Sequence, residues 1–161
     1  MDFLSQQSLT GCLMNAALAA GTTSTISTTG TTHFAIKGKA YSTAAKTNAA
    51  TPTTDAATGQ AFTGITANQG TVVVVGLDST GAVKAAQGTV TALDSSGAFV
   101  VAPQMPYVPD TMCPIGYIVL KAGSTLSGTW TFGTSNLSGV SGMTYTFVSV
   151  ALGLPERPQI S

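Results

Sequence analysis

VVVVGLDSTGAV, residues 72–83, is the stretch that most directly indicates the fold. Residues 72–77 form a short and wholly apolar run, which is typical of a strand buried on both faces. Residues 78–81, Asp-Ser-Thr-Gly, match a type I turn with glycine at its end. Residues 83–91 then provide the returning strand. The stretch therefore predicts an antiparallel β-hairpin.

The same turn pattern recurs one hairpin further along the chain. Residues 94–97, Asp-Ser-Ser-Gly, precede residues 98–102, which are predicted to form the next strand of a β-meander. Four prolines follow between positions 103 and 114, and proline is excluded from the centre of a sheet. Residues 103–113 are therefore predicted to be a Pro-rich crossing segment.

Strands are also predicted on both sides of this central region. Downstream, residues 115–121 and 144–152 are the last two strands. Upstream, β-branched residues on both sides of Gly30 predict a hairpin over residues 22–37. Residues 41–70 are rich in Ala, Thr, Asn and Gly, and they are predicted to form a long loop or an extended arm.

The N-terminal segment is the one place where the spacing favours a helix. Apolar residues at positions 9, 13, 16, 17 and 20 fall on one stripe of a helix over residues 3–20. Asp2 can cap its start, and Gly21 suits its C-terminal end. This pattern predicts a helix with an apolar tip at Phe3 and Leu4.

Together these patterns predict a mainly β fold, an antiparallel β-sandwich or barrel-like domain with one N-terminal helix. The expected organisation is an N-terminal helical arm over 1–21, a β-rich region over 22–102 with the loop 41–70, the crossing segment 103–113, and a C-terminal β-hairpin region over 114–161 of the same compact unit.

The chain carries few charges. Its 161 residues include six basic and six acidic side chains, so the formal net charge is zero and 7% of residues are charged, where about 25% is usual. This composition excludes nucleic-acid binding driven by phosphate neutralisation and docking of a polybasic surface on a membrane. The polar positions hold 27 threonines and 15 serines instead.

Hydroxyl groups keep a surface hydrated, and two such surfaces can come into contact without the cost of removing water from charged groups. The composition therefore favours a protein that lies against copies of itself or against a large partner, and the alternative is a merely neutral Thr- and Ala-rich domain. Cys12 and Cys113 predict two unpaired thiols in a chain made in a reducing cytoplasm. Asp2, with no preceding Lys or Arg, argues against a signal peptide.

No catalytic device is recognisable in the sequence. His33 is the single histidine. The sequence has no G-x-S-x-G motif, whose serine would be the nucleophile that a histidine activates. One histidine and two distant cysteines give no metal-ligand spacing. Asp78 and Asp94 are expected to accept hydrogen bonds from amides in their own turns. We therefore predict no enzymatic activity, no cofactor and no metal.

The last third of the chain resembles a known family. Residues 113–120, CPIGYIVL, resemble a strand opening of tailed-phage head proteins, and the segments 133–137, 144–148 and 154–158 follow in the same order. The plan is similar to that of phage capsid decoration proteins, also called cement or head-fibre proteins. The resemblance covers residues 113–158. It implies a structural virion protein, made in the host cytoplasm, that binds the major capsid protein on the outer surface of the shell, often as a trimer.

The residues expected at a capsid or subunit interface are Phe3, Leu4, Leu9, Leu13, Trp130 and Phe132. The expected partners are the major capsid protein and the chain itself, with no nucleic acid and no membrane. Two alternatives remain open. One is a tail-fibre or adhesin-like module that binds a host glycan through Trp130, Phe132, Tyr117 and Tyr145, and the other is a phage hydrolase of cell walls.

Overall fold

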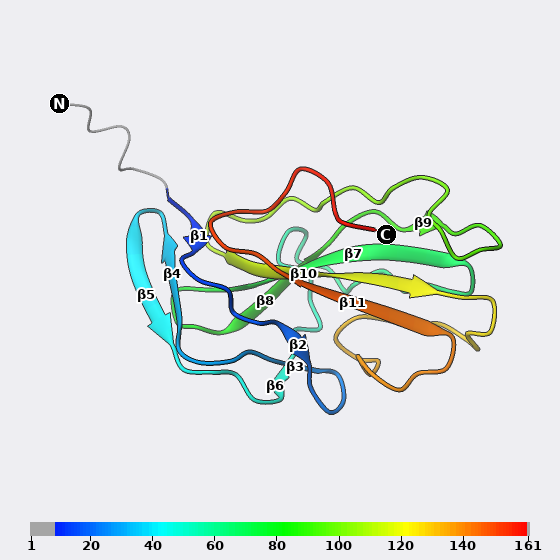
Figure 1. The fold of residues 1–161 in the computed structure, drawn as a ribbon, viewed down its shortest axis with the longest axis horizontal. Helices are drawn as coiled ribbons and strands as arrows, with labels where there is room; N and C mark the ends of the chain where they lie inside the picture. Colours follow the sequence, from blue (N-terminus) through cyan, green and yellow to red (C-terminus); the bar gives the residue numbers. More distant parts are fainter. Residues whose placement is uncertain (1–8, 161) are drawn as a thin grey trace.

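The computed structural model describes residues 9–160, which form eleven strands and no helix. All strand pairs are antiparallel, so the prediction of a mainly β, antiparallel fold is confirmed. The central sheet has the order β11-β10-β7-β8, and β9 pairs with the start of β7 (Figure 1). Its strands are β7 (Gln69–Leu77), β8 (Val83–Gln87), β9 (Thr91–Ala92), β10 (Cys113–Ala122) and β11 (Met143–Ser149).

Strand β7 is buried on both faces, as its apolar run predicts. Because side chains alternate along a strand, Val73 and Val75 pack into one core cluster while Val72 and Val74 pack into another. The hairpin with β8 is also confirmed, with Val83 opposite Leu77. The returning strand is shorter than expected, since β8 ends at Gln87.

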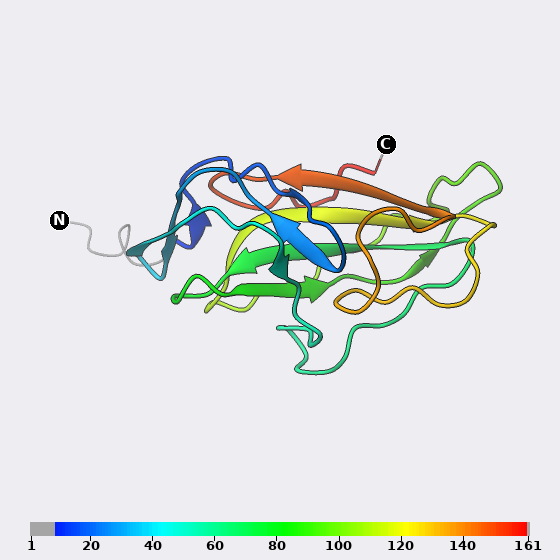
Figure 2. The same cartoon turned by 90° about the horizontal axis from the view of Figure 1, so that it is seen from below.

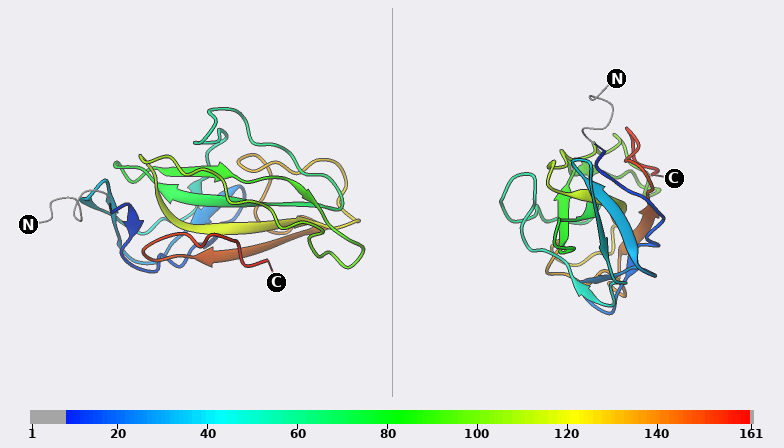
Figure 3. Two further views of the ribbon diagram at one scale, coloured as in Figure 1. Left: turned by 90° about the horizontal axis from the view of Figure 1, so that it is seen from above. Right: turned by 90° about the vertical axis from the view of Figure 1, so that its left-hand side faces the viewer.

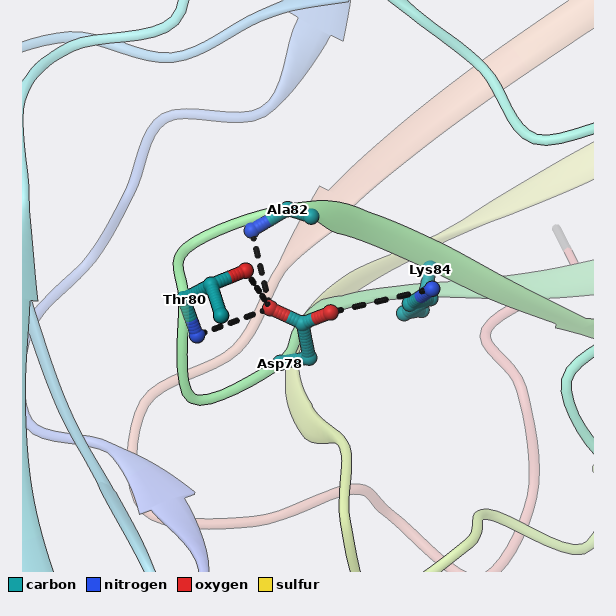
Figure 4. A network of polar contacts seen from close by, with 4 residues as sticks. All are labelled: Asp78, Thr80, Ala82 and Lys84. Atoms are coloured by element: carbon teal, nitrogen blue, oxygen red, sulfur yellow. Dashed lines mark hydrogen bonds and ion pairs between the residues drawn. The ribbon is translucent and has the colours of Figure 1, made fainter.

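Both Asp-Ser-x-Gly turns form, and their aspartates act as expected. Asp78 Oδ1 accepts hydrogen bonds from the amides of Thr80 and Ala82 and from the Thr80 hydroxyl, and Lys84 lies 3.6 Å from Oδ2 (Figure 4). Asp94 repeats this pattern with Ser96 and Ala98. The strand predicted over residues 98–102 is wrong, however. An isolated bridge joins Leu93 to Phe99, and residues 100–102 have no strand assignment.

Two small sheets pack against the face of the central sheet that carries Val73 and Val75. In Figure 2 the sheet with β3 lies in front of this face, and the sheet with β4 and β5 lies at its left end. One has the order β1-β4-β5 and lies at the end of the molecule where the described chain begins (Figure 1), and the other has the order β2-β3-β6. Their strands are β1 (Gly11–Cys12), β2 (Ala19–Ala20), β3 (Thr25–Ser27), β4 (Thr32–Ile36), β5 (Lys39–Thr43) and β6 (Ala49–Ala50).

The hairpin predicted around Gly30 is not formed. The turn lies instead at Lys37 and Gly38, which join β4 to β5 and both have positive φ, as in the two-residue turns that suit hairpins. Strand β3 pairs with β2 and β6. Residues 41–70 contain β6 and the end of β5, so this segment is partly a strand region.

The helix predicted over residues 3–20 is wrong for its described part, residues 9–20, and its beginning lies outside the described residues. This segment contains the short strands β1 and β2 and no helical turn. Cys12, Ala16 and Leu18 are buried, while residues 13, 15, 17 and 19 are exposed. This alternation has the period of two that defines a strand. The spacing of four residues between Leu9 and Leu13 fits both the helical period of 3.6 and the strand period of two, which explains why a helix was predicted here.

The opposite face of the central sheet, which carries Val72 and Val74, is covered by two segments without regular secondary structure (Figure 3, left). They are residues 99–112 (the proline segment) and residues 150–160 (the C-terminal segment). They contribute Met105, Val108 and Leu154 to a cluster around Tyr117. The Tyr117 hydroxyl accepts a hydrogen bond from the Gln159 amide, at 3.0 Å. No helix in the described residues is long and apolar enough to cross a membrane.

Candidate interaction surface

The structure separates the residues predicted for an interface. Leu9 and Leu13 are on the surface, with 49% and 45% of their area exposed. Trp130 and Phe132 are in the core, with 3% and 1% exposed. Phe3 and Leu4 lie outside the described residues. The structure adds Leu152, which is 66% exposed and which the sequence analysis did not select.

Leu9, Leu13 and Leu152 form what we call the leucine cluster. Leu9 and Leu13 lie just before and just after β1, and both are exposed while Cys12 of β1 is buried in the core. The backbone of Leu152 crosses β1 at Gly11, where a Cβ atom would lie 3.0 Å from the Leu152 carbonyl oxygen. The three leucines therefore lie together at one end of the molecule.

Hydrogen bonds fix the backbone of this cluster. The Leu152 amide donates to the Cys12 carbonyl at 2.7 Å, and the Leu13 amide donates to the His33 carbonyl at 2.9 Å. Leu152 has a φ of 68°, a left-handed conformation that costs a residue with a side chain about 1–2 kcal/mol. The chain is thus held in an unfavourable conformation that presents a large apolar side chain to solvent, and such strain is common at functional sites.

One ion pair and one further lysine lie near the cluster. Lys37, whose amide donates to the Thr10 hydroxyl, forms an exposed ion pair with Asp110 at 2.7 Å. Exposed pairs of this kind add little stability. The exposed Lys39 follows Gly38, whose amide donates to the Leu9 carbonyl, so a lysine also lies at this end of the molecule.

Other groups that could carry chemistry are already occupied. Asp55 is buried, and its two carboxylate oxygens accept hydrogen bonds from the amides of Ala57 and Gln87. It lines a surface groove of about 550 Å³ together with Asp78 and Lys84. Because the oxygens of Asp78 are taken by its turn and by Lys84, the carboxylates of this groove serve the fold.

The cysteines are both free, as expected. Burial raises the pKa of the Cys12 thiol, and it raises the pKa of Cys113 to about 12, with a smaller contribution from the nearby Cys12. Thiols react as thiolates, so both are unreactive near neutral pH. His33 lies on the exposed side of β4. Among residues 9–160, no three His, Cys, Asp or Glu side chains gather as a metal site.

The aromatic residues considered for sugar stacking are used inside the fold. Trp130 and Tyr117 are buried, and Trp130 Nε1 donates to the Asn136 carbonyl at 2.9 Å. The Tyr145 hydroxyl donates to the same carbonyl at 3.0 Å. Stacking a sugar on Trp130 or Tyr117 would require the core to open.

The turn at Asp78 makes stability depend on pH. Burial raises the pKa of Asp78, but the hydrogen bonds from Thr80 and Ala82 and the charge of Lys84 together hold this pKa below its ordinary value. A carboxyl with a lowered folded-state pKa contributes stability above its unfolded-state pKa of about 3.9 and loses it as the pH falls through the folded-state value.

We expect the urea midpoint of the wild type to fall as the pH is lowered from about 5 to about 2. The midpoint of Asp78→Asn should start lower at neutral pH and fall less, because the variant cannot be protonated at this site. Urea unfolding at a series of pH values measures both effects. Parallel curves for the two proteins would show that Asp78 does not contribute in this way.

Comparison with known proteins identifies no relative: no family model matches the chain, and no curated protein or solved structure matches it. The leucine cluster is therefore interpreted from its geometry and from the composition of the chain.

Proposed function

We propose that the chain is a structural protein of a phage virion that binds the outer surface of the capsid and stabilises the shell. The observation that carries this proposal is the leucine cluster, a set of exposed apolar side chains that includes Leu152 in a left-handed conformation, on a chain with 7% charged residues. The resemblance of residues 113–158 to decoration proteins supplies the class of partner, the major capsid protein. Localisation on the virion belongs to the same proposal.

The architecture supports this role through its rigidity. We infer that the central sheet and the two small sheets form a β-sandwich, with the first core cluster between the layers. The leucine cluster lies at the end of this body, beside β1 and at the start of the C-terminal segment. A rigid body with an apolar end can rest on a lattice and contact more than one subunit at high effective concentration.

Apolar burial drives this contact, so binding depends little on salt. Each leucine that becomes buried contributes about 1.5–3 kcal/mol, and about 1.4 kcal/mol corresponds to a tenfold change in affinity. Homotrimers, which the resemblance implies, would multiply the number of contacts per particle.

We expect the double variant Leu13→Ser/Leu152→Ser to lose at least about tenfold in affinity for the capsid. The partner is the empty shell of the phage whose genome encodes the chain, assembled without this protein, and co-sedimentation measures the bound fraction. Tyr107→Ser is the matched control, because Tyr107 is 71% exposed on the proline segment. A second double variant, Phe3→Ser/Leu4→Ser, tests the two residues outside the described range.

Full binding by Leu13→Ser/Leu152→Ser would remove the leucine cluster as the docking surface. No binding of the wild-type chain to the shell, with binding on a glycan array, would replace the proposal by the adhesin alternative.

A further inference from the structure

The two edge strands of the central sheet, β8 and β11, differ in whether other parts of the chain cover their outer backbone groups. The outer edge of β8 is covered by the loop that contains Asp55 and Ala56. The Gln87 amide donates to Asp55 Oδ2 at 3.0 Å, and the Ala56 amide donates to the Ala85 carbonyl at 2.8 Å. Covering an edge in this way prevents it from pairing with another chain.

The opposite edge, β11, has no such cover over its middle. The Val150 amide donates a hydrogen bond to the Ile115 carbonyl, with 3.1 Å between nitrogen and oxygen, next to the Gly116–Ser149 pair. This fixes which residues of β11 bond to β10, because bonded and non-bonded pairs alternate in an antiparallel ladder. Tyr145 and Phe147 consequently direct their amide and carbonyl groups away from β10.

In the part of the chain that the structure describes, no backbone hydrogen bond reaches the amides or carbonyls of Tyr145 and Phe147 from this side. The open edge ends near Ser149, whose hydroxyl accepts a hydrogen bond from the Leu18 amide at 2.8 Å. The Met143 amide is bonded within its own turn, to Val140. The free edge is therefore centred on Thr146.

Strand β11 also lacks the features that block edge pairing. Its sequence, MTYTFVS, has no charged residue and no proline, and its register with β10 has no bulge. Strand β5, the outer strand of a small sheet, carries the exposed Lys39. Among these edges, β11 is the one that is long, uncharged and open.

We propose that β11 pairs antiparallel with β11 of a second copy of this chain, with Thr146 on the two-fold axis. In this register Tyr145 is opposite Phe147 of the second copy, and the reverse pair forms by symmetry. Each of these pairs exchanges two N–H···O bonds, and Thr146 faces Thr146 of the second copy in the pair between them. The central sheets of the two copies become one continuous sheet.

The uncharged sequence of β11 and its pairing with itself in this register favour a second copy as the occupant. The chain has no net charge, and the register places no charged residue of β11 opposite another. Lys121, opposite Thr144 on β10, donates to the Ile160 carbonyl at 3.0 Å and does not reach the edge. Aromatic pairs across strands and facing threonines are both favourable contacts. This contact goes beyond the proposed function, because it requires no capsid.

A cysteine at position 146 tests the register directly. Directly opposed residues in a non-hydrogen-bonded pair have Cα atoms about 4.5 Å apart, within the range for a disulfide. We expect Thr146→Cys to form a covalent dimer when treated with a thiol-specific oxidant such as diamide. Thr144→Cys is the matched control: it is also exposed and on the same face of β11, but it faces Val148 of the second copy. It should cross-link at least tenfold more slowly.

Charge substitution at the same position tests the contact without cross-linking. Thr146→Lys and Thr146→Glu should each be monomeric by sedimentation velocity, because like charges would oppose each other across the axis. An equimolar mixture should restore the dimer. Thr144→Lys should retain it, and circular dichroism checks that every variant is folded.

Three results would overturn the proposal. The first is a wild-type chain that stays monomeric over a concentration series up to the millimolar range. The second is a dimer that persists in both Thr146→Lys and Thr146→Glu, and the third is equal cross-linking of the two cysteine variants. Either of the last two would place the contact elsewhere.

Discussion

Phe132→Ala is expected to lower the free energy of unfolding by about 3–5 kcal/mol, as truncation of a buried phenylalanine usually does. Phe132 is 1% exposed, and its ring meets that of Phe62 edge to face, with centroids 5.0 Å apart. The Trp130 ring is also close, with its centroid 6.4 Å from that of Phe132. The removed ring would leave a cavity that these rigid neighbours cannot fill.

Urea unfolding followed by the fluorescence of Trp130, the single tryptophan, measures this loss. Tyr107→Ala is the control, because Tyr107 is 71% exposed and its truncation should change stability by less than about 0.5 kcal/mol. A loss below about 1 kcal/mol for Phe132→Ala would contradict the packing described for this residue.

Gly133→Ala should destabilise the fold by about 2–5 kcal/mol for two separate reasons. Gly133 has a φ of 85°, where an alanine costs about 1–2 kcal/mol. A Cβ at this position would also meet the Pro52 carbonyl oxygen, which is backbone and cannot move aside easily. Overpacking of this kind costs about 1–3 kcal/mol more.

Gly97→Ala separates the two effects. Gly97 has a similar φ of 79°, but no atom lies within 4 Å of the position a Cβ would take. It should therefore show the conformational cost alone. The same denaturant titration applies to both variants, and an equal loss of stability would mean that the approach of Pro52 to Gly133 contributes nothing.

The parts of the fold that were predicted correctly depend on local patterns. The apolar run 72–77 specifies a strand buried on both faces, and Asp78 and Asp94 form their turns with neighbouring amides. The hairpin over residues 22–37 was misplaced because β-branched residues indicate strands without fixing their partners. The turn at Lys37 and Gly38 became recognisable only from its backbone conformation.

The N-terminal segment shows how a pattern can fit two structures. Leucines four positions apart satisfy a helix and a strand equally, and packing against β4 and β10 selects the strand. The same limit applies to the candidate site. Leu152 is distant in sequence from Leu9 and Leu13, and only the tertiary fold brings its backbone onto Gly11. Trp130 and Phe132 could not be assigned to core or surface from their identity alone.

The position of β10 in the centre of the sheet has a consequence for synthesis of the chain. β10 joins β7 to β11, so the edge of β7 that pairs with β10 has unpaired backbone groups until residue 122 has left the ribosome. At about 5–20 residues per second, the interval between the ends of β7 and β10 lasts several seconds. During this interval the nascent valine-rich strand is a target for chaperones, and codons that slow translation between the two strands should lower the yield of native protein.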